Sequence, residues 1–276
     1  DEHTGKALLR LGQLAEAPPA ALAALTVYRE RFPKGPHLAA LRLRLAELQA
    51  AAGDLPAAQA NYEALLADQP PADLAPAIAY GLGWCLMRAQ KLPEAEAALA
   101  KVPVTDLTQE LSRLALLQRG EIAYLREQWA VARGHFAPVA AAKGPQAERA
   151  LYMLGWCARR LDDRAAAETA FSGLLTRFPT SELAPDAALR LAEALLAKPA
   201  PAEARKVLET ALVKLAPGPA EELRHRLAET LVAMGEWAAL RVHCQEMLKL
   251  YPESKQRYLM QFRLGLACQN LGLFEE

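Results

Sequence analysis

Three side chains at helical spacing could serve as metal ligands or as an acid–base pair. His225 lies one turn from Glu222 and one turn from Glu229. Imidazole and carboxylate groups ligate zinc and also act as general acids and bases. Charged residues spaced in this way more often pair on a solvated helix face, and the other histidines form no cluster along the sequence. We therefore favour a salt-bridged surface here and expect no catalytic residue, no metal site and no cofactor.

The four cysteines and the short motifs offer no catalytic centre either. Cys85, Cys157, Cys244 and Cys268 lack the close spacing of zinc or redox motifs and are too few for a disulfide framework. Cys244 and Cys268 could pair in an oxidising compartment, although we favour free, buried thiols. No Gly-rich phosphate loop, GxSxG elbow or HExxH motif occurs. We therefore expect a protein that is not an enzyme.

Composition narrows the class of fold and of partner. The 276 residues carry 32 basic and 32 acidic side chains, so the surplus of cations that a nucleic-acid binder needs is missing. Ala and Leu, strong helix formers, dominate the apolar fraction and predict an all-α fold. No apolar run is long enough to span a membrane. The length suggests two domains or an array of repeats.

A repeat accounts for the length. YGLGWC at 80–85 returns as YMLGWC at 152–157, and a small residue recurs every 34 to 37 residues, usually after Leu. The small residues are Gly12, Ala46, Gly83, Gly120, Gly155, Ala192, Ala228 and Gly265. A second small residue, usually Ala, follows 12 positions later, and a large apolar residue such as Leu99, Phe136 or Phe171 follows 16 positions later. Each unit therefore holds two helices, and small residues on the first helix let the second approach closely.

This pattern resembles the tetratricopeptide repeat, most clearly at 45–70, 154–179 and 227–252. The resemblance implies a right-handed α–α superhelix, a solenoid of about seven and a half helix-turn-helix repeats. We expect one array over residues 1–276, cut from a longer protein. The expected repeats span 3–33, 36–70, 73–104, 107–143, 145–179, 182–217, 219–252 and an incomplete 255–276.

The resemblance also implies a binding face. In this family, the first helices expose the residues three before and one, four and five after the small residue, here called the inner positions. In repeats three to five these positions supply the candidate partner-binding residues Tyr80, Trp84, Arg88, Glu121, Tyr124, Tyr152, Trp156, Arg159 and Arg160. Five of the eleven Trp and Tyr residues of the chain fall in this set.

Aromatic residues with arginines are typical of binding hot spots, so these positions predict a site for an extended peptide or a partner helix. The alternative is that Tyr80 and Tyr152 fill gaps between neighbouring first helices and that the Trp rings lie flat on their neighbours. The Lys/Asn clamp with which some family members hold the acidic tails of chaperones is missing, because matching positions carry residues such as Glu47 and Trp84.

The leading hypothesis is a non-enzymatic scaffold that binds a peptide or protein partner. The alternative is a regulatory or assembly domain of a larger protein with a catalytic or membrane-anchored module. The repeat junctions Phe178-Pro179-Thr180-Ser181 and Tyr251-Pro252-Glu253-Ser254 resemble those of bacterial envelope members of the family. We therefore expect a bacterial protein of the periplasm or cell envelope, with the cytoplasm as the alternative. The oligomeric state stays open.

Overall fold

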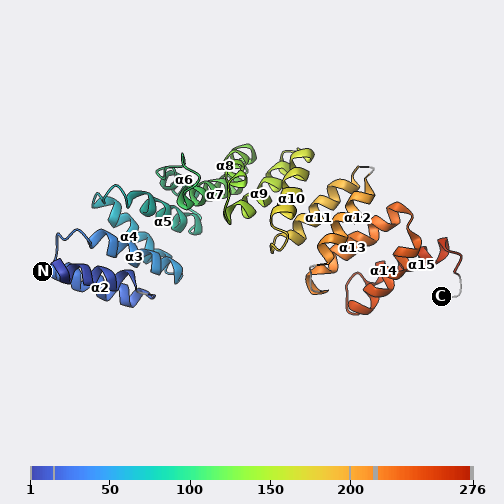
Figure 1. Cartoon of the computed structure of the whole chain (residues 1–276), viewed down its shortest axis with the longest axis horizontal. Helices are drawn as coiled ribbons and strands as arrows, with labels where there is room; N and C mark the ends of the chain where they lie inside the picture. Colours follow the sequence, from blue (N-terminus) through green and yellow to red (C-terminus); the bar gives the residue numbers. More distant parts are fainter. Residues whose placement is uncertain (1, 15, 199, 214–216, 274–276) are drawn as a thin grey trace. The chain divides into compact units, whose positions relative to one another are not determined.

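Helices make up the regular structure of the chain. The computed structural model describes residues 2–14, 16–198, 200–213 and 217–273, and these ranges contain fifteen α-helices and no strand. The chain divides into two compact units, Asp1–Gln146 and Ala147–Glu276, each described here by itself (Figure 1). The expected all-α fold is confirmed. The last residues of the eighth expected repeat, 274–276, lie outside the described ranges.

The first unit holds four helix pairs. Their helices are α1 (Glu2–Gln13), α2 (Pro18–Arg31), α3 (Leu38–Ala51), α4 (Leu55–Ala67), α5 (Ala75–Arg88), α6 (Leu92–Leu99), α7 (Glu110–Leu125) and α8 (Trp129–Ala141). Each first helix packs against its own second helix, and α1, α3 and α5 also pack against the next first helix, as α3 does against α5. The first helices α1, α3, α5 and α7 therefore form a continuous row.

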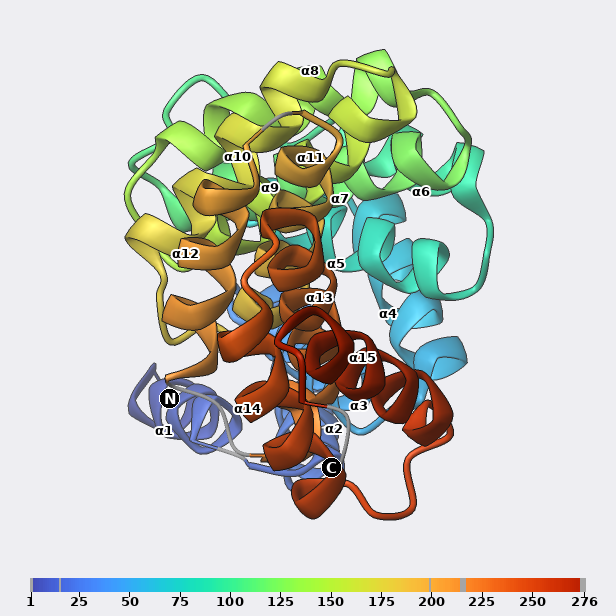
Figure 2. The same ribbon diagram turned by 90° about the vertical axis from the view of Figure 1, so that its right-hand side faces the viewer.

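The second unit repeats this arrangement. Its helices are α9 (Gln146–Arg160), α10 (Arg164–Arg177), α11 (Ala184–Leu196), α12 (Pro201–Leu212), α13 (Pro217–Met234), α14 (Trp237–Leu250) and α15 (Arg257–Asn270). Helix α9 begins at the last residue of the first unit and continues into the second. The first helices α11 and α13 contact each other, and each also contacts α12, which lies between them along the chain (Figure 2).

Local sequence signals set the helix boundaries. Asp54 and Asp163 cap α4 and α10, because their carboxylates accept hydrogen bonds from the backbone N–H groups of Ala57 (3.2 Å) and Ala166 (3.1 Å). The turns before α4 and α14 contain Gly53 and Gly235 at φ +85° and +68°, a left-handed conformation that glycine adopts without strain.

The two junctions singled out in the sequence share one arrangement. The hydroxyl of Ser181 accepts a hydrogen bond from the N–H of Leu183 and donates to Glu148, a residue of the preceding first helix. Ser254 does the same with the N–H of Gln256 and with Glu221. The shared sequence Pro-x-Ser therefore ties the start of a repeat to the first helix of the repeat before it.

Close contact between a glycine and a large apolar side chain holds three helix pairs together, α5 with α6, α7 with α8 and α9 with α10. A Cβ atom added to Gly120 would lie 2.5 Å from Cε1 of Phe136, and one added to Gly83 would lie 2.5 Å from Cγ of Leu99. Gly155 contacts Phe171 in the same way. The 16-residue spacing in the sequence therefore marks direct contacts. The small residue of the first helix lies closer to this large side chain than to the alanine of the second helix.

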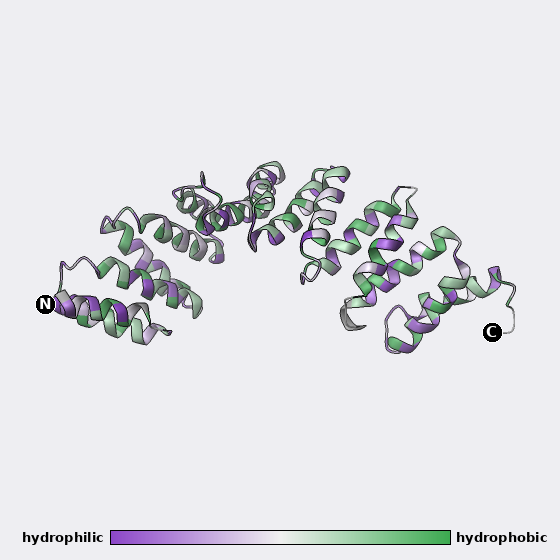
Figure 3. Cartoon of the chain, viewed as in Figure 1, coloured by the Kyte–Doolittle hydropathy of each residue, from purple (hydrophilic) through white to green (hydrophobic). Residues whose placement is uncertain are grey.

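The last helix differs because the structure describes no second helix against it. A Cβ atom on Gly265, the counterpart of Gly120, would have no atom within 4 Å. Tyr258 and Phe262 on the same helix are 83% and 68% exposed. The helices carry both hydrophobic and hydrophilic residues (Figure 3). No helix among the described residues is long and apolar enough to cross a membrane.

Two histidines are buried in the second unit. His225 on α13 is 3% exposed, and neither of its ring nitrogens has a hydrogen-bond partner in the described chain; Oε1 of Glu221 lies 3.6 Å from Nε2. Nε2 of His243 lies 2.8 Å from the carbonyl oxygen of Arg224. Burial lowers the pKa of both imidazoles, although Glu221 and the Arg224 carbonyl oppose this shift. The solvated, salt-bridged face that we expected around His225 is thus wrong for His225 itself.

The glycine contacts predict opposite outcomes for two equivalent substitutions. Gly120→Ala places a methyl group too close to the fully buried ring of Phe136. We expect it to destabilise the protein by about 1–3 kcal/mol, despite the better helix propensity of alanine. Gly265→Ala is expected to be neutral or stabilising by up to about 1 kcal/mol, because its methyl group meets no neighbour. Urea unfolding of both variants measures this, and equal stability would contradict the packing described here.

The buried histidines predict acid sensitivity. A lowered folded-state pKa means that the unfolded chain binds more protons, so stability is complete above about pH 6.5 and declines as the pH falls below that value. The decline is at most about 1.4 kcal/mol per pH unit for each histidine. The free energy of unfolding, measured between about pH 7.5 and 5.5, should depend less on pH in a His225→Gln/His243→Gln variant. An unchanged pH profile would argue against protonation of these two side chains as the cause.

Candidate functional site

Tyr80 on α5 links two first helices of the first unit. Its hydroxyl accepts a hydrogen bond of 2.9 Å from Nε2 of Gln118 on α7. The ring is half-buried and packs against Ala79, Val102 and Ala115. Burial raises the pKa of Tyr80 to about 12, with a smaller contribution from the charge of Glu121. Tyr80 therefore fills the space between neighbouring first helices, which is the alternative role that the sequence left open.

Trp84 lies one turn further along α5. Its indole is half-buried and packs against the apolar core of the first unit. The guanidinium carbon of Arg88, an exposed residue, lies 5.7 Å from the ring centroid, a cation–π distance. Trp84 and Arg88 thus present an aromatic ring and a cation side by side at the inner positions.

Helix α7 contributes Glu121 and Tyr124, both half-buried. The ring of Tyr124 meets that of Trp129 edge to face, with the centroids 4.7 Å apart. Trp129 is the first residue of α8, so this pair joins the end of one helix to the start of the next. Gln118, which bonds Tyr80, lies one turn before Glu121 on α7 and brings these residues into the row begun by α5.

In the second unit, Tyr152 and Trp156 lie on α9 with their ring centroids 6.2 Å apart. The hydroxyl of Tyr152 donates a hydrogen bond of 2.8 Å to Oδ2 of Asp186 on α11. The indole of Trp156 has two cations near it, because the guanidinium carbons of Arg159 and Arg190 each lie 5.4 Å from its centroid. Both aromatic residues of α9 are therefore tied to α11.

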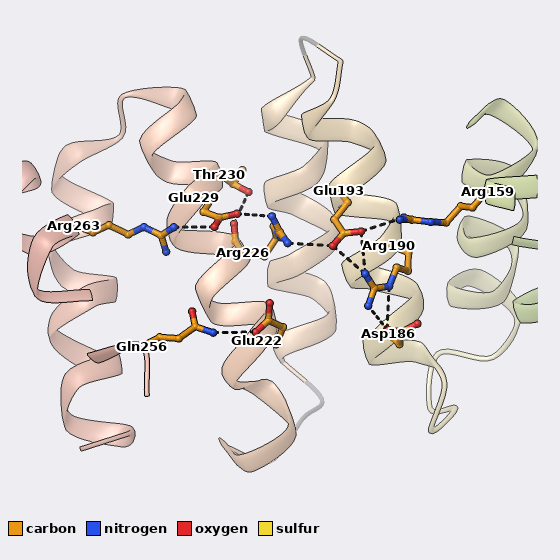
Figure 4. Close-up of polar contacts among 10 residues, drawn as sticks. All are labelled: Arg159, Asp186, Arg190, Glu193, Glu222, Arg226, Glu229, Thr230, Gln256 and Arg263. Carbon is orange, nitrogen blue, oxygen red and sulfur yellow. Dashed lines mark hydrogen bonds and ion pairs between the residues drawn. The ribbon is translucent and has the colours of Figure 1, made fainter. Parts of the chain in front are cut away.

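Alternating charges extend from Trp156 across the first helices of the second unit (Figure 4). We call this set the ion-pair ladder; it consists of Arg159, Asp186, Arg190, Glu193, Arg226, Glu229 and Arg263. Glu193 is its centre, since it accepts hydrogen bonds of 3.1 Å from Arg159, Arg190 and Arg226. Glu229 joins Arg226 (2.6 Å) to Arg263 (2.9 Å). The ladder connects α9, α11, α13 and α15.

The ladder orders side chains more than it stabilises the fold. Isolated surface pairs contribute about 0.2–1 kcal/mol, and most members of the ladder are a quarter to two fifths exposed. Arg263, at 9%, is the most buried and also donates to the carbonyl oxygen of His225. Because Glu193 is shared by three guanidiniums and Glu229 by two, one pair holds the next in place. The inner positions of this unit therefore present a preorganised, mixed-charge surface.

The sequence contains a signal for the ladder that we did not use. Arginine stands two residues before the small residue, and glutamate one residue after it, in repeats six and seven, as Arg190 with Glu193 and Arg226 with Glu229. Repeat two has the same pair, and repeat eight has the arginine, Arg263. The position two before the small residue is not among the inner positions that the family pattern names.

The candidate set also omits an aromatic residue on the last helix of the second unit. Phe262 stands three residues before Gly265, the inner position that Tyr80 and Tyr152 occupy in their repeats. It is 68% exposed, more than these half-buried tyrosines. The same register would have identified it had we extended the candidate set to the incomplete repeat.

The nine candidates fall into three groups by helix. Tyr80, Trp84 and Arg88 lie on α5, Glu121 and Tyr124 on α7, and Tyr152, Trp156, Arg159 and the exposed Arg160 on α9. Whether these groups form one binding surface stays a prediction, as does the single array over 1–276. Chemically, the described side chains can stack on apolar groups and pair with charges. Within the described ranges, no group of three His, Cys, Asp or Glu residues could hold a metal ion.

The four cysteines are buried, and none of them forms a disulfide. Burial raises the pKa of the Cys85 and Cys244 thiols to about 11, so both are protonated at neutral pH. Since the thiolate is the reactive form, these residues behave as small apolar groups of the core.

Comparison with known protein families identifies the type of repeat in two parts of the sequence. Two models of the tetratricopeptide repeat family match the sequence, at residues 43–106 and 149–181. No curated protein matches it.

Solved structures share the fold at low sequence identity. The C-terminal part of a tetratricopeptide repeat protein from Cytophaga hutchinsonii is 16% identical, with a TM-score of 0.69 over 94% of this chain and 99% of that one. A tetratricopeptide repeat protein from Parabacteroides merdae is 14% identical, with a TM-score of 0.56 over 96% and 99% of the two chains. YrrB, described as a tetratricopeptide protein with an unusual peptide-binding site, is 13% identical, with a TM-score of 0.51 over 67% and 91%.

The paired helices, the contacts between glycine and large side chains, and the family matches agree. The chain is an all-α solenoid and belongs to the tetratricopeptide repeat family.

Proposed function

We propose that the chain binds a peptide segment or a partner protein through the inner positions of its first helices and catalyses no reaction. The tetratricopeptide fold is in general a scaffold for protein–protein interaction. The observation that carries the proposal is the pairing of a half-buried indole with a guanidinium at Trp84 and again at Trp156. Trp and Arg are enriched among residues that dominate binding energy.

The tyrosines have a supporting role in this proposal. Tyr80 and Tyr152 use their hydroxyl groups to bond Gln118 and Asp186 of neighbouring first helices. They hold the spacing between helices, and the adjacent indoles are half-buried. We therefore assign the direct contacts with a partner to Trp84 and Trp156 and the positioning of these rings to the tyrosines. The peptide-binding site named for YrrB supports a peptide as one form of ligand for this fold.

We further propose that this interaction belongs to a bacterial envelope assembly. The support is the pair of junctions at 178–181 and 251–254, whose serines make equivalent bonds to the preceding first helix. Fractionation of bacterial cells that express the native gene tests the compartment. We expect the protein in the periplasmic or envelope fraction, and recovery from the cytosol alone would refute this part of the proposal.

The binding role predicts the effect of removing both indoles. A Trp84→Ala/Trp156→Ala variant should lose partner binding by at least about thirtyfold, the effect of losing a hot spot worth about 2 kcal/mol. Its helix content, measured by far-ultraviolet circular dichroism, should stay close to that of the native chain, because both rings are only half-buried. Cross-linking in cells, followed by mass spectrometry, identifies and quantifies the partner.

A matched control removes apolar surface elsewhere. Val131 and Val242 are 48% and 51% exposed and lie on the second helices α8 and α14. The Val131→Ala/Val242→Ala variant should retain the partner. Normal cross-linking by the double tryptophan variant, or the absence of any protein partner with the native chain, would refute the proposal.

A further inference from the structure

A pocket with an arginine rim opens beside Trp156 in the second unit. It has a volume of about 250 Å³ and lies among α9, α10 and α11. Arg159, Arg164 and Arg190 line its polar side together with Asp162 and Glu193. Three guanidiniums and two carboxylates line it, and Asp186, which bonds Arg190, adds a third carboxylate beside the rim. An anionic group is therefore favoured only where a guanidinium of the rim retains unused N–H donors.

The arginines of the rim differ in how firmly they are held. Arg190 donates two bonds to Oδ1 of Asp186, at 3.0 and 3.2 Å, and further bonds to Glu193. Arg159 bonds Glu193 through Nη1 alone. Arg164 makes one ion pair, 3.7 Å long, with the exposed carboxylate of Asp162. Arg159 and Arg164 therefore retain N–H donors that a ligand could engage, since a guanidinium carries five.

Stability does not explain why an arginine stands at position 164. It is the first residue of α10, where the helix dipole places partial positive charge and disfavours a cation. The carboxylate of Asp163, which caps this N-terminus, offsets the helix dipole there. Attraction of an anion therefore rests on the guanidiniums of Arg159 and Arg164 at the polar side of the cavity.

The remaining lining selects the kind of anion. Ala167, Ala194 and Ala197 and the ring of Phe171 provide an apolar side, so a methylene stem finds complementary surface there. Inorganic ions lack such a stem. A glutamate side chain carries a carboxylate on two methylene groups and matches both sides of the pocket.

We infer that this pocket receives an internal glutamate side chain of the bound partner, with its carboxylate between Arg159 and Arg164. The inference rests on the proposed peptide-binding function and names one residue that the partner must supply. Glu193 competes with the partner's carboxylate for the guanidinium of Arg159. When the partner's carboxylate replaces Glu193 at Arg159, Glu193 retains its hydrogen bonds from Arg190 and Arg226. Because Arg159 also lies near Trp156, the pocket adjoins the aromatic part of the inner positions.

The test uses the full chain and the peptide Ac-Phe-Ala-Glu-Ala-Phe-NH₂, with Gln in place of Glu as the neutral match. Binding is followed by NMR through the Nε–Hε signals of the arginines. We expect a dissociation constant on the order of 1 mM for the Glu peptide and at least about tenfold weaker binding of the Gln peptide. A third peptide, Ac-Phe-Ala-Ala-COO⁻, offers only a terminal carboxylate and should bind like the Gln peptide.

Variants of the chain identify the arginine responsible. Arg164→Gln should reduce binding of the Glu peptide to the level of the Gln peptide without lowering stability. Arg205→Gln, on α12 and outside the pocket, is the control and should leave peptide binding unchanged. Glu193→Gln should strengthen binding about threefold or more, because the competing carboxylate is gone.

Three results would overturn the inference: equal binding of the Glu and Gln peptides, unchanged binding by Arg164→Gln, or equal binding of the terminal-carboxylate peptide. These results leave the proposed function standing if cross-linking of the native partner still depends on Trp84 and Trp156. Loss of that dependence, with glutamate binding intact, would instead refute the proposed function alone.

Discussion

The close approach of two helices at a glycine is the constraint on which the other features depend. Gly83, Gly120 and Gly155 each leave room for one large side chain of the second helix, and that side chain is fully buried. A protein interior packed to this density tolerates little change of volume. The contact fixes the rotation of α5, α7 and α9 about their own axes. That rotation in turn decides which residues enter the core and which remain at the inner positions.

The inner positions of the two units carry different residues and therefore differ in chemistry. In the first unit, Tyr80 and Gln118 join neighbouring first helices by one neutral hydrogen bond, and Trp84 packs on the core. In the second unit, the ion-pair ladder takes this role from α9 to α15. The hydrogen bond and the ladder both set the spacing of first helices on their polar side. They differ in salt dependence, because screening weakens partly exposed ion pairs more than a neutral bond.

Much of the fold could be predicted from the sequence because a single contact repeats. The 16-residue step from Gly120 to Phe136 corresponds to one contact, and the same step recurs in other repeats. Which inner residues are already bonded to one another could not be predicted, since it depends on distances between helices that lie 33 to 38 residues apart in the chain. His225 shows the limit most clearly. Its spacing from charged neighbours suggested a solvated face, yet its ring enters the core while Glu229 on the same helix joins the ladder.

A surface whose polar groups already have partners must bind by exchange. Each bond that a ligand makes to the ladder replaces an internal one, so the net gain is the difference between two similar interactions. Specificity is then governed by the positions where the internal partner is poorest. Arg190 and Arg226 are held by well-placed carboxylates, whereas Arg164 has one long and exposed contact. The weakest internal bond, rather than the greatest density of charge, therefore indicates where a partner can add binding energy to the contacts made by the neighbouring indole.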